Sequence, residues 1–532
     1  MINKIVIHNY KIFDDFNLEL NQDLNIIVGD NETGKSTLLE ATHLALTKRL
    51  NGRFIESEFS PYLFNNKSVS QFLDALKSDH KPAPPEIFIE LYFDDNPDLA
   101  SFRGSNNSLR EDQIGIRLEI VFDEDFKEDY EKLLVDPADI NLIPIEYYKV
   151  NWRTFADNPI NSPRGIPINP SFVDATTIRL QSGTDYYLQN IINNELEVNE
   201  RVALNVAYRK LKEEFAKENS ISAINKRLTE SKGLVTDKQL SVAIDLSQKA
   251  SWESNIVPHL DDLPFQFAGK GEQSSLKIML ALDKKVDDTN IVLIEEPENH
   301  LSYTRMNVLI NKIKEKCADK QIIIATHSSF VLNKLGLNKL ILVRNGRESR
   351  FKNLPDDTQQ YFKKLSGYDT LRLILTKKAL LVEGPSDELI VQKAYLNKHK
   401  KLPIEDGIDV INVRGLSFLR FLEIAKELEI EVAVVTDNDG NHAHKVEEKY
   451  KNYVSLPKIG IFYDKDDSAK TLETQIVKCN EINILNKILG QSYKDKAQLS
   501  EYMQENKTEC ALKLFDTQEK FEIPKYIQNA VE

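Results

Sequence analysis

The chain has 532 residues, of which 41% are hydrophobic and 29% charged, and its formal net charge is −14. This length exceeds one typical hydrophobic core, so we expect several domains, and the composition excludes a disordered or fibrous protein. The acidic balance excludes a protein that grips nucleic acid over its whole surface, because such surfaces are basic. Contact with nucleic acid would need local basic patches, bound cations or a partner.

The cysteines and the N-terminus bear on location. Cys317, Cys479 and Cys510 are too widely spaced for a zinc pattern and too few for a disulfide framework, which favours a reducing, cytoplasmic setting. The chain starts in a strand pattern without an apolar signal-peptide region. No apolar run approaches the length of a membrane span, so we expect no membrane contact.

The first motif in the chain is a glycine-rich loop between a strand predicted at 25–28 and a helix predicted at 38–41. The loop reads Gly29-Asp30-Asn31-Glu32-Thr33-Gly34-Lys35-Ser36-Thr37. In this context G-x-x-x-x-G-K-S predicts backbone N–H groups and a helix N-terminus that cradle a nucleoside triphosphate, ATP. We expect Lys35 to reach the β- and γ-phosphates and Ser36 to hold Mg²⁺. The alternative is an ordinary glycine turn before a helix.

The rest of residues 1–171 predicts mainly strands. Alternating apolar residues predict two strands around a turn before the loop, and clear strands are expected at 86–93 and 114–122. Several strands with few helices favour an antiparallel sheet beside the nucleotide-binding core. The stretch 135–172 contains many prolines, and we expect extended connections there.

Residues 172–250 nearly lack glycine and proline, and their apolar residues recur at helical spacing. This texture predicts a helical subdomain. Whether the subdomain is inserted into an ATPase and forms a dimer contact stays open at this point.

The nucleotide-binding pattern resumes in residues 251–352. The turn Gly269-Lys270-Gly271-Glu272-Gln273 opens a predicted helix and forms another phosphate-facing helix N-terminus. A strand at 291–294 delivers Glu295, which can accept from Mg²⁺-bound water, and Glu296, which can orient or deprotonate the attacking water. A further strand at 321–325 precedes His327, which could contact a γ-phosphate or be merely structural.

After linker helices predicted at 353–376, a second α/β unit fills 377–532. Strands predicted at 378–382, 408–413 and 432–435 alternate with helices, which is typical of a parallel sheet with its site at the strand carboxyl ends. The first and third of these strands deliver four acidic residues, Glu383, Asp387, Asp437 and Asp439.

These carboxylates predict a metal site. Asp437 and Asp439 stand at i and i+2 on an extended segment, so they point to one side, and with Glu383 they would repel one another unless cations lay between them. Hard oxygen ligands favour Mg²⁺ or Mn²⁺, and such a site suits phosphodiester hydrolysis. The alternative is a simple polar turn.

The motifs of the first half resemble, in this order, the ABC-type ATPases of the SMC and RecF kind. Gly34-Lys35-Ser36 match the phosphate loop, Gly269–Gln273 the signature motif, Leu293–Pro297 the Walker B strand and His327 the switch histidine. The resemblance implies ATP held between two heads, hence a homodimer or higher oligomer. Glu295 stands where most relatives carry Asp, and Lys11 where they often carry an arginine. The resemblance implies further nucleotide contacts from Lys11, Gly29, Asn31, Thr37, Gly269 and Gly271.

The second half resembles a Toprim domain, and the combination resembles, over essentially the whole chain, the OLD (overcoming lysogenisation defect) family of ATP-dependent nucleases. The likeness implies an ABC ATPase with a helical dimerisation insert and a C-terminal Toprim nuclease. By that likeness Glu383, Asp387, Asp437 and Asp439 are metal ligands. Glu473 would add an acidic ligand and Lys507 would stabilise phosphate charge, although a surface carboxylate and a solvated lysine are alternatives.

The implied function is an ATP-regulated DNA endonuclease that defends against phage, as in Gabija-like and retron-associated systems. Its implied partners are DNA, with RNA as an alternative, and a helicase-like subunit or a reverse transcriptase with its nucleic acid. Basic residues at 398–401 and 442–451 are possible DNA contacts.

Two other functions compete with this one. The first is a non-nucleolytic ATP-dependent sensor or clamp of the SMC or RecF type in DNA repair. A topoisomerase or primase is disfavoured, because the sequence has no cysteine-rich zinc module and no recognisable tyrosine-bearing cleavage domain.

Overall fold

The structure is a computed structural model of the chain. It describes all residues except 78–81, 135–139, 175–179, 182–183, 186–195, 231–241, 244–251, 253–256, 285–288, 345, 352, 366–368 and 416–417. The chain forms two compact units: unit 1 comprises Met1–Leu24 and Ser36–Ala325, and unit 2 comprises Asn25–Lys35 and Thr326–Glu532. Within the described ranges, each helix is too short or too polar to span a bilayer.

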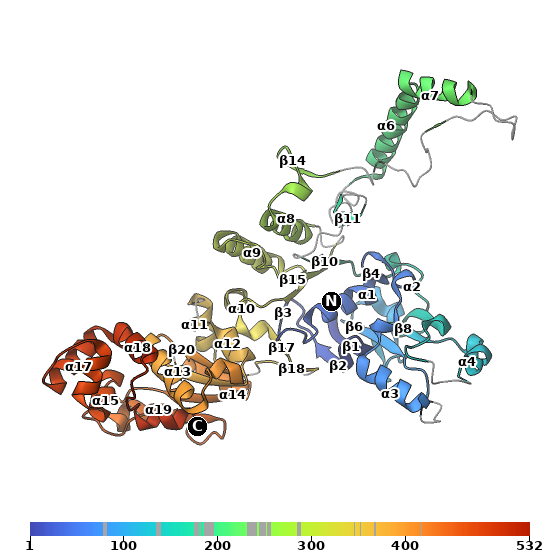
Figure 1. The fold of residues 1–532 in the computed structure, drawn as a ribbon. Coiled ribbons are helices and arrows are strands. Elements are labelled where there is room, and N and C mark those ends of the chain that lie inside the picture. Colours follow the sequence, from blue (N-terminus) through green and yellow to red (C-terminus); the bar gives the residue numbers. More distant parts are fainter. Residues whose placement is uncertain are drawn as a thin grey trace. The chain divides into compact units, whose positions relative to one another are not determined.

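Unit 1 contains the predicted antiparallel sheet (Figure 1). Strand β1 (Ile2–Tyr10) pairs with β2 (Phe13–Glu19) and β6 (Ile87–Phe93), and β8 (Gln113–Phe122) pairs with β6, β7 (Arg103–Gly104) and β9 (Tyr148–Thr154). A charged network holds this sheet: fully buried Glu90 accepts from Arg117 at 2.8 Å, from the Ser108 amide at 2.8 Å and from the Ser108 hydroxyl at 2.6 Å.

The proline-rich stretch 135–172 is more ordered than the sequence predicts. It contains β9 and the start of β10 (Pro170–Asp174), where connections alone are expected. The prolines do not prevent this, because β9 has none and β10 carries its proline as the first residue, where no ladder N–H is lost.

Unit 1 also carries parallel strands of the predicted nucleotide-binding part. Strand β15 (Ile291–Glu295) lies between β10 and β16 (Gln321–Ala325), and the register aligns Asp174, Glu295 and Ala325. Helices α1 (Lys35–Thr47), α8 (Lys270–Asp283) and α9 (Tyr303–Lys316) accompany them. The apolar residues of β15 and β16 are buried, as their unbroken runs predict.

The predicted helical segment 172–250 lies partly outside the described residues. Two helices are described there, α6 (Val198–Ala216) and α7 (Asn219–Glu230), and α6 exposes apolar side chains such as Val198 and Val202. The dimer contact stays a prediction.

Unit 2 contains β3 (Leu24–Val28) from its second residue onward, and β3 pairs in parallel with β17 (Leu340–Arg344), itself antiparallel to β18 (Arg347–Ser349). Helices α10 (Ser329–Leu335), α11 (Asp356–Lys364) and α12 (Thr370–Leu375) lead to a parallel sheet of order β20-β19-β21-β22. Its strands are β19 (Lys378–Val382), β20 (Ile408–Asn412), β21 (Glu431–Val435) and β22 (Ile459–Phe462).

Helices cover this sheet, and all of them except α14 contribute to one apolar core with it (Figure 1). They are α13 (Pro385–His399), α14 (Phe418–Glu427), α15 (Leu472–Cys479), α16 (Ile482–Leu489), α17 (Lys496–Glu505), α18 (Lys507–Asp516) and α19 (Lys525–Ala530). The remaining α-helices and strands among the described residues belong to unit 1 and are β4 (Arg49–Leu50), β5 (Arg53–Phe54), α2 (Ile55–Glu58), α3 (Asn66–Lys77), α4 (Lys127–Leu133), β11 (Leu180–Gln181), β12 (Thr184–Asp185), β13 (His259–Leu260) and β14 (Leu263–Pro264).

Candidate functional site

The backbone of the predicted phosphate loop requires glycine at two positions, Gly29 and Gly34. A Cβ on Gly29 would lie 2.5 Å from the carbonyl oxygen of Val343, and Gly34 has a φ of +97°. Buried Lys35 donates to the carbonyls of Gly29 (3.0 Å) and Asp30 (2.7 Å), so its ammonium lies inside the loop. Asn31 and Ser36 are exposed and Thr37 is half-buried. Side chains at Gly29 and Gly34 would therefore disturb this loop, so the loop backbone keeps its shape only with glycine at both positions.

Carboxylates gather beside Ser36 within unit 1. Burial is the largest of the influences that raise the pKa of Glu295, and nearby Asp174 and Glu296 raise it further, while a hydrogen bond with Ser36 lowers it. A carboxylate in such surroundings gains from a cation, which would offset both burial and repulsion. Ser36 and Glu295 thus fit the Mg²⁺ that accompanies a triphosphate.

Two other predicted nucleotide residues in unit 1 have partners. Glu296 has a positive φ of 45° and accepts a hydrogen bond from Asn299. The Lys11 ammonium pairs with Glu40, which also accepts from Tyr10. Neither contact tests a role toward nucleotide.

The two glycines of the predicted signature turn differ. A Cβ on Gly271 would lie 2.2 Å from the carbonyl oxygen of His300, whereas one on Gly269 would meet nothing within 4 Å. Buried Gln273 donates to the carbonyls of Phe265 and Ala268, both at 2.8 Å, and so fixes the entry into α8. Close packing explains Gly271, and the fold leaves Gly269 sterically unconstrained.

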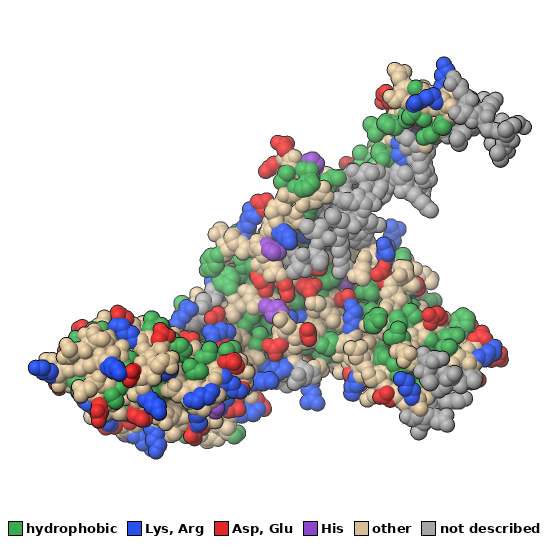
Figure 2. All heavy atoms as spheres, viewed as in Figure 1, with side chains coloured by type: hydrophobic (Ala, Val, Ile, Leu, Met, Phe, Trp, Pro, Cys, Tyr) green, Lys and Arg blue, Asp and Glu red, His purple; other side chains and the backbone are tan. Residues whose placement is uncertain are grey.

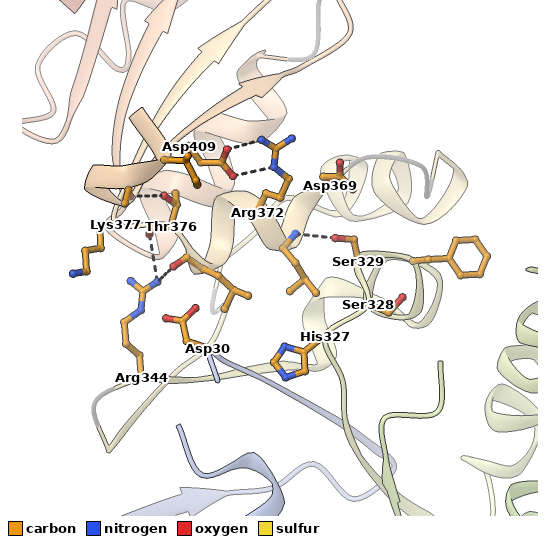
Figure 3. A pocket seen from close by; sticks show the side chains of 15 residues that line it. Asp30, His327, Ser328, Ser329, Arg344, Asp369, Arg372, Thr376, Lys377 and Asp409 are labelled. Carbon is orange, nitrogen blue, oxygen red and sulfur yellow. Dashed lines mark hydrogen bonds and ion pairs between the residues drawn. The ribbon is translucent and has the colours of Figure 1, made fainter. Parts of the chain in front are cut away.

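His327 lines a cavity of about 970 Å³ in unit 2 (Figure 3). The cavity is also lined by Asp30 of the phosphate loop and by basic residues, including Arg344 and Arg372. In the close-up view the imidazole of His327 points into this space. The structure therefore brings the predicted switch histidine and the phosphate loop to one cavity.

The Toprim half brings acidic side chains together at the carboxyl ends of β19 and β21. Glu383 accepts from the Thr436 hydroxyl at 2.7 Å and from the Asp437 amide at 3.3 Å. Asp387, in the first turn of α13, accepts from the Gly384 amide at 3.1 Å. The predicted neighbours Glu383 and Asp437 are thus in contact.

Electrostatics shows how tightly these groups are gathered. Burial, then Glu383 and Glu473, raise the pKa of Asp387 to about 7. Burial, then Asp387, Glu383 and Glu473, raise the pKa of Asp437 to about 8. Glu383 and Glu473 therefore act on both aspartates, and we name Glu383, Asp387, Asp437 and Glu473 the acidic cluster.

Glu473 joins the cluster from α15, and Lys507 joins it from α18. The buried Glu473 carboxylate lies 3.7 Å from the Lys507 ammonium. Asp439 differs from its expected placement: its φ of +49° starts a turn, its side chain is exposed, and it is not among the groups that shift the pKa of Asp387 or Asp437. The left-handed turn ends the extended segment on which the prediction rested.

The acidic cluster suits a divalent cation in its donor chemistry. Among the described residues, the buried oxygens Asp437 Oδ1 and Glu473 Oε2 have no hydrogen-bond partner. A buried carboxylate oxygen without a donor is costly unless a proton or a cation neutralises it, and of these two oxygens only Glu473 Oε2 has a cation near it among the described side chains, the Lys507 ammonium at 3.7 Å. Over the same residues, no group of three or more His, Cys, Asp or Glu side chains has the closeness of a formed metal site. The side-chain types therefore suit a divalent metal, but their oxygens lie farther apart than the ligands of a bound metal.

Several residues of this site escape the sequence analysis. Thr436 orients Glu383, and fully buried Asn438 donates to the carbonyls of Asp464 (2.9 Å) and Asp466 (3.0 Å), which fixes the loop after β21. Tyr526 on α19 is buried near the cluster, and its pKa is raised by burial and then by acidic neighbours, with Asp437 first. Asp174 is a comparable addition in unit 1. The only sequence signal for Thr436 and Asn438 is their place beside Asp437.

Lysines of the predicted basic cluster at 398–401 form ion pairs with acidic residues. Lys398 pairs with Glu532 and Lys401 with Asp406, so much of the 398–401 charge is neutralised. In Figure 2, basic and acidic side chains are interspersed over the visible face of the C-terminal helices. Any nucleic-acid contact there would therefore be local.

Family comparisons match both halves of the chain. Residues 374–439 match the family described as "Overcoming lysogenization defect protein-like, TOPRIM domain". Residues 4–253 match an "AAA domain" and residues 180–332 an "AAA ATPase domain". As classes, such domains use a nucleotide and a divalent metal. The predicted pairing of an ATPase with an OLD-like Toprim domain is confirmed.

The chain is also similar to individual known proteins. The chain is 23% identical over 462 residues to "Endonuclease GajA" of Bacillus cereus (strain VD045), covering 82% of this chain and 74% of the relative. A solved structure of the recombination mediator protein RecF aligns with 65% of this chain and 97% of its own, at 12% identity and a TM-score of 0.34. The C-terminal region of the Xanthomonas campestris pv. campestris OLD protein aligns with 30% of this chain and 92% of its own, at 18% identity and a TM-score of 0.24.

Proposed function

We propose that this chain, which carries an AAA ATPase domain and an OLD-like Toprim domain and is homologous to the endonuclease GajA, is an ATP-regulated, Mg²⁺- or Mn²⁺-dependent DNA endonuclease. The acidic cluster carries this proposal. Its four carboxyl groups come from the ends of β19 and β21 and from α13 and α15, their proximity raises the pKa of Asp387 and Asp437, and two of their oxygens have no hydrogen-bond donor among the described residues. A divalent cation would relieve both the burial and the mutual repulsion of these carboxylates, which otherwise favour protonated Asp387 and Asp437.

In this proposal Glu383, Asp387, Asp437 and Glu473 hold the metal, with Asp439 at the edge as a further ligand. A divalent metal bound there activates water and stabilises the leaving oxygen of a phosphodiester. Thr436 donates to Glu383 and so fixes one oxygen of that carboxylate, leaving the other oxygen for the metal. Lys507, 3.7 Å from Glu473, stabilises negative charge on the phosphate.

ATP binds, in the same proposal, at the phosphate loop. Lys35 turns from the loop carbonyls to the phosphates, Ser36 and Glu295 hold Mg²⁺, and Glu296 orients the water. Gly29, Asn31, Gly34 and Thr37 line the loop, and Lys11 stands beside it. Gly269 and Gly271 would face the nucleotide of a second copy, which requires a homodimer or higher oligomer.

Contacts of α12 support communication between the two halves. On one side, the Thr370 hydroxyl donates to Asn333 at 2.7 Å and the Leu371 amide donates to Ser329 at 3.3 Å, just after His327. On the other side, Arg372 forms two hydrogen bonds to Asp409 on β20 of the Toprim sheet (Figure 3). A shift of the switch histidine would therefore move α12 and reach the sheet that bears the acidic cluster.

Plasmid cleavage tests the proposal. Wild-type protein with Mg²⁺ or Mn²⁺ should nick or linearise supercoiled plasmid, and Glu383→Ala should not. Glu388→Ala, on the same helix as Asp387 but outside the cluster, is the matched control and should cut. No cutting by the wild type with either metal, with and without ATP, would refute the nuclease.

One observation favours the second function, an ATP-dependent sensor or clamp that does not cut. The described carboxylates do not form a closed metal site. For a clamp, Glu383→Ala would leave DNA retention intact and the wild type would never cut. The proposed role in phage defence, with a partner subunit in the cytoplasm, rests on the family resemblance, and loss of protection in cells carrying Glu383→Ala tests it.

A further inference from the structure

Lys449 follows the turn that carries Asp437 and Asp439 and lies on a short helical segment. The centre of this segment, Ala443–Glu448, is a π-helix (η12), a form that is rare and frequent at functional sites. The next residue, Tyr450, is fully buried and packs against Phe418 at a ring distance of 6.4 Å. The core thus fixes the backbone of Lys449 beside the acidic cluster.

The Lys449 ammonium rests on aromatic rings. It lies 5.0 Å from the ring centre of Tyr450 and 5.8 Å from that of Phe418, and the residue is half-buried. Cation–π contacts hold an ammonium without using its N–H donors. The side chain is therefore positioned while its hydrogen-bonding capacity remains available.

Two other lysines of unit 2 each lie close to one carboxylate, in contrast to Lys449. Lys458 pairs with Glu429 at 3.0 Å, and Lys507 lies 3.7 Å from Glu473. Glu383 and Asp439 act on Lys449 through space, but among the described residues no carboxylate lies within ion-pair distance of it. The Lys449 ammonium therefore lies in the field of these carboxylates without forming an ion pair with one of them.

We propose that Lys449 is a substrate-binding residue that donates to a backbone phosphate of the nucleic acid at the acidic cluster. This inference rests on the proposed nuclease function. Lys507 lies against Glu473, whereas Lys449 acts on Glu383 and Asp439, so the two cations flank different carboxylates. A polyanion approaching a row of carboxylates needs such cations beside the metal, because phosphate and carboxylate repel each other.

Lys449→Met is the direct test, because methionine keeps an apolar stem over the two rings and removes the charge. The full chain is titrated onto a short fluorescent DNA duplex in Ca²⁺, at several salt concentrations. We expect Kd to rise about tenfold, as for loss of a hydrogen bond to a charged group, and the slope of log Kd against log salt to become shallower by about one. Lys449→Arg should retain most of the affinity.

Lys458→Ala is the control for net charge, since Lys458 precedes β22 at the opposite end of the strands. Equal Kd and salt slope for Lys449→Met and wild type, or an equal loss in Lys458→Ala, would overturn the inference. Plasmid cleavage separates this failure from failure of the proposed function. If the wild type cuts and Lys449→Met binds and cuts normally, only the role of Lys449 is lost, whereas a wild type that never cuts refutes the nuclease itself.

Discussion

Replacing Asp437 by Asn should change how the stability of the protein depends on pH. Burial, and then Asp387, Glu383 and Glu473, raise the pKa of Asp437 from 3.8 to about 8. The folded protein therefore keeps a proton that the unfolded chain releases. The stability from this group is fully present below the unfolded pKa and is lost as the pH rises through about 8.

The size of the effect follows from this shift. Each pH unit over which the folded state holds one extra proton lowers the free energy of unfolding by about 1.4 kcal/mol. Between pH 6 and 8, the ionisation of Asp437 should lower the free energy of unfolding by about 2 kcal/mol. This value is an upper bound, because neighbouring groups adjust when Asp437 ionises. Asparagine cannot ionise, so Asp437→Asn should remove this part of the slope.

The assay is unfolding at a series of pH values in EDTA, followed by a probe in the Toprim half. Asp357→Asn is the control, because Arg420 lowers the pKa of exposed Asp357, which is therefore ionised in both states over this range. The wild type and the control should lose stability with the same slope. A variant slope equal to that of the wild type would show that Asp437 is not held protonated, and the reasoning would be refuted.

Three further predictions concern the ATPase half. Gly271→Ala should lower the free energy of unfolding by about 1–3 kcal/mol, because the new Cβ would lie 2.2 Å from the His300 carbonyl oxygen. Gly269→Ala, the control, should cost less than about 1 kcal/mol in the same denaturation assay, and equal losses would contradict the packing argument. Lys35→Ala should abolish binding of fluorescent ATP, and retained binding would exclude the phosphate loop as the site. Glu90→Gln should cost about 1–3 kcal/mol in thermal unfolding, because the fully buried Glu90 carboxylate accepts from Ser108 and Arg117 while Arg117 keeps Glu119 as its other counter-charge, and no measurable change would contradict this.

Local motifs explain which parts of the fold the sequence predicts well. The phosphate loop and the buried strands β15, β16, β19 and β21 are predicted from residues adjacent in sequence, because glycine spacing marks the loop and unbroken apolar runs mark the strands. The same is true of Glu383 and Asp437, which lie where two parallel strands end. Their proximity follows from strand–helix alternation alone.

Other features depend on contacts that a local pattern cannot reveal. Asp439 is expected beside Asp437 on an extended segment, but its φ of +49° turns it to the surface. Tyr526 approaches the cluster through a 2.7 Å hydrogen bond to Gln475, which lies 51 residues away in sequence. Asp174 becomes a neighbour of Glu295 only because β10 pairs with β15.

Binding of Mn²⁺ to the full chain, followed by electron paramagnetic resonance, tests most directly whether the acidic cluster is a metal site. With ATP absent, so that the phosphate loop contributes little, the wild type should bind Mn²⁺, and Asp387→Asn combined with Glu473→Gln should lose that binding. Glu388→Gln should bind like the wild type. Unchanged Mn²⁺ binding in the double variant would contradict a metal held by these carboxylates, and with it the proposed mechanism of cutting.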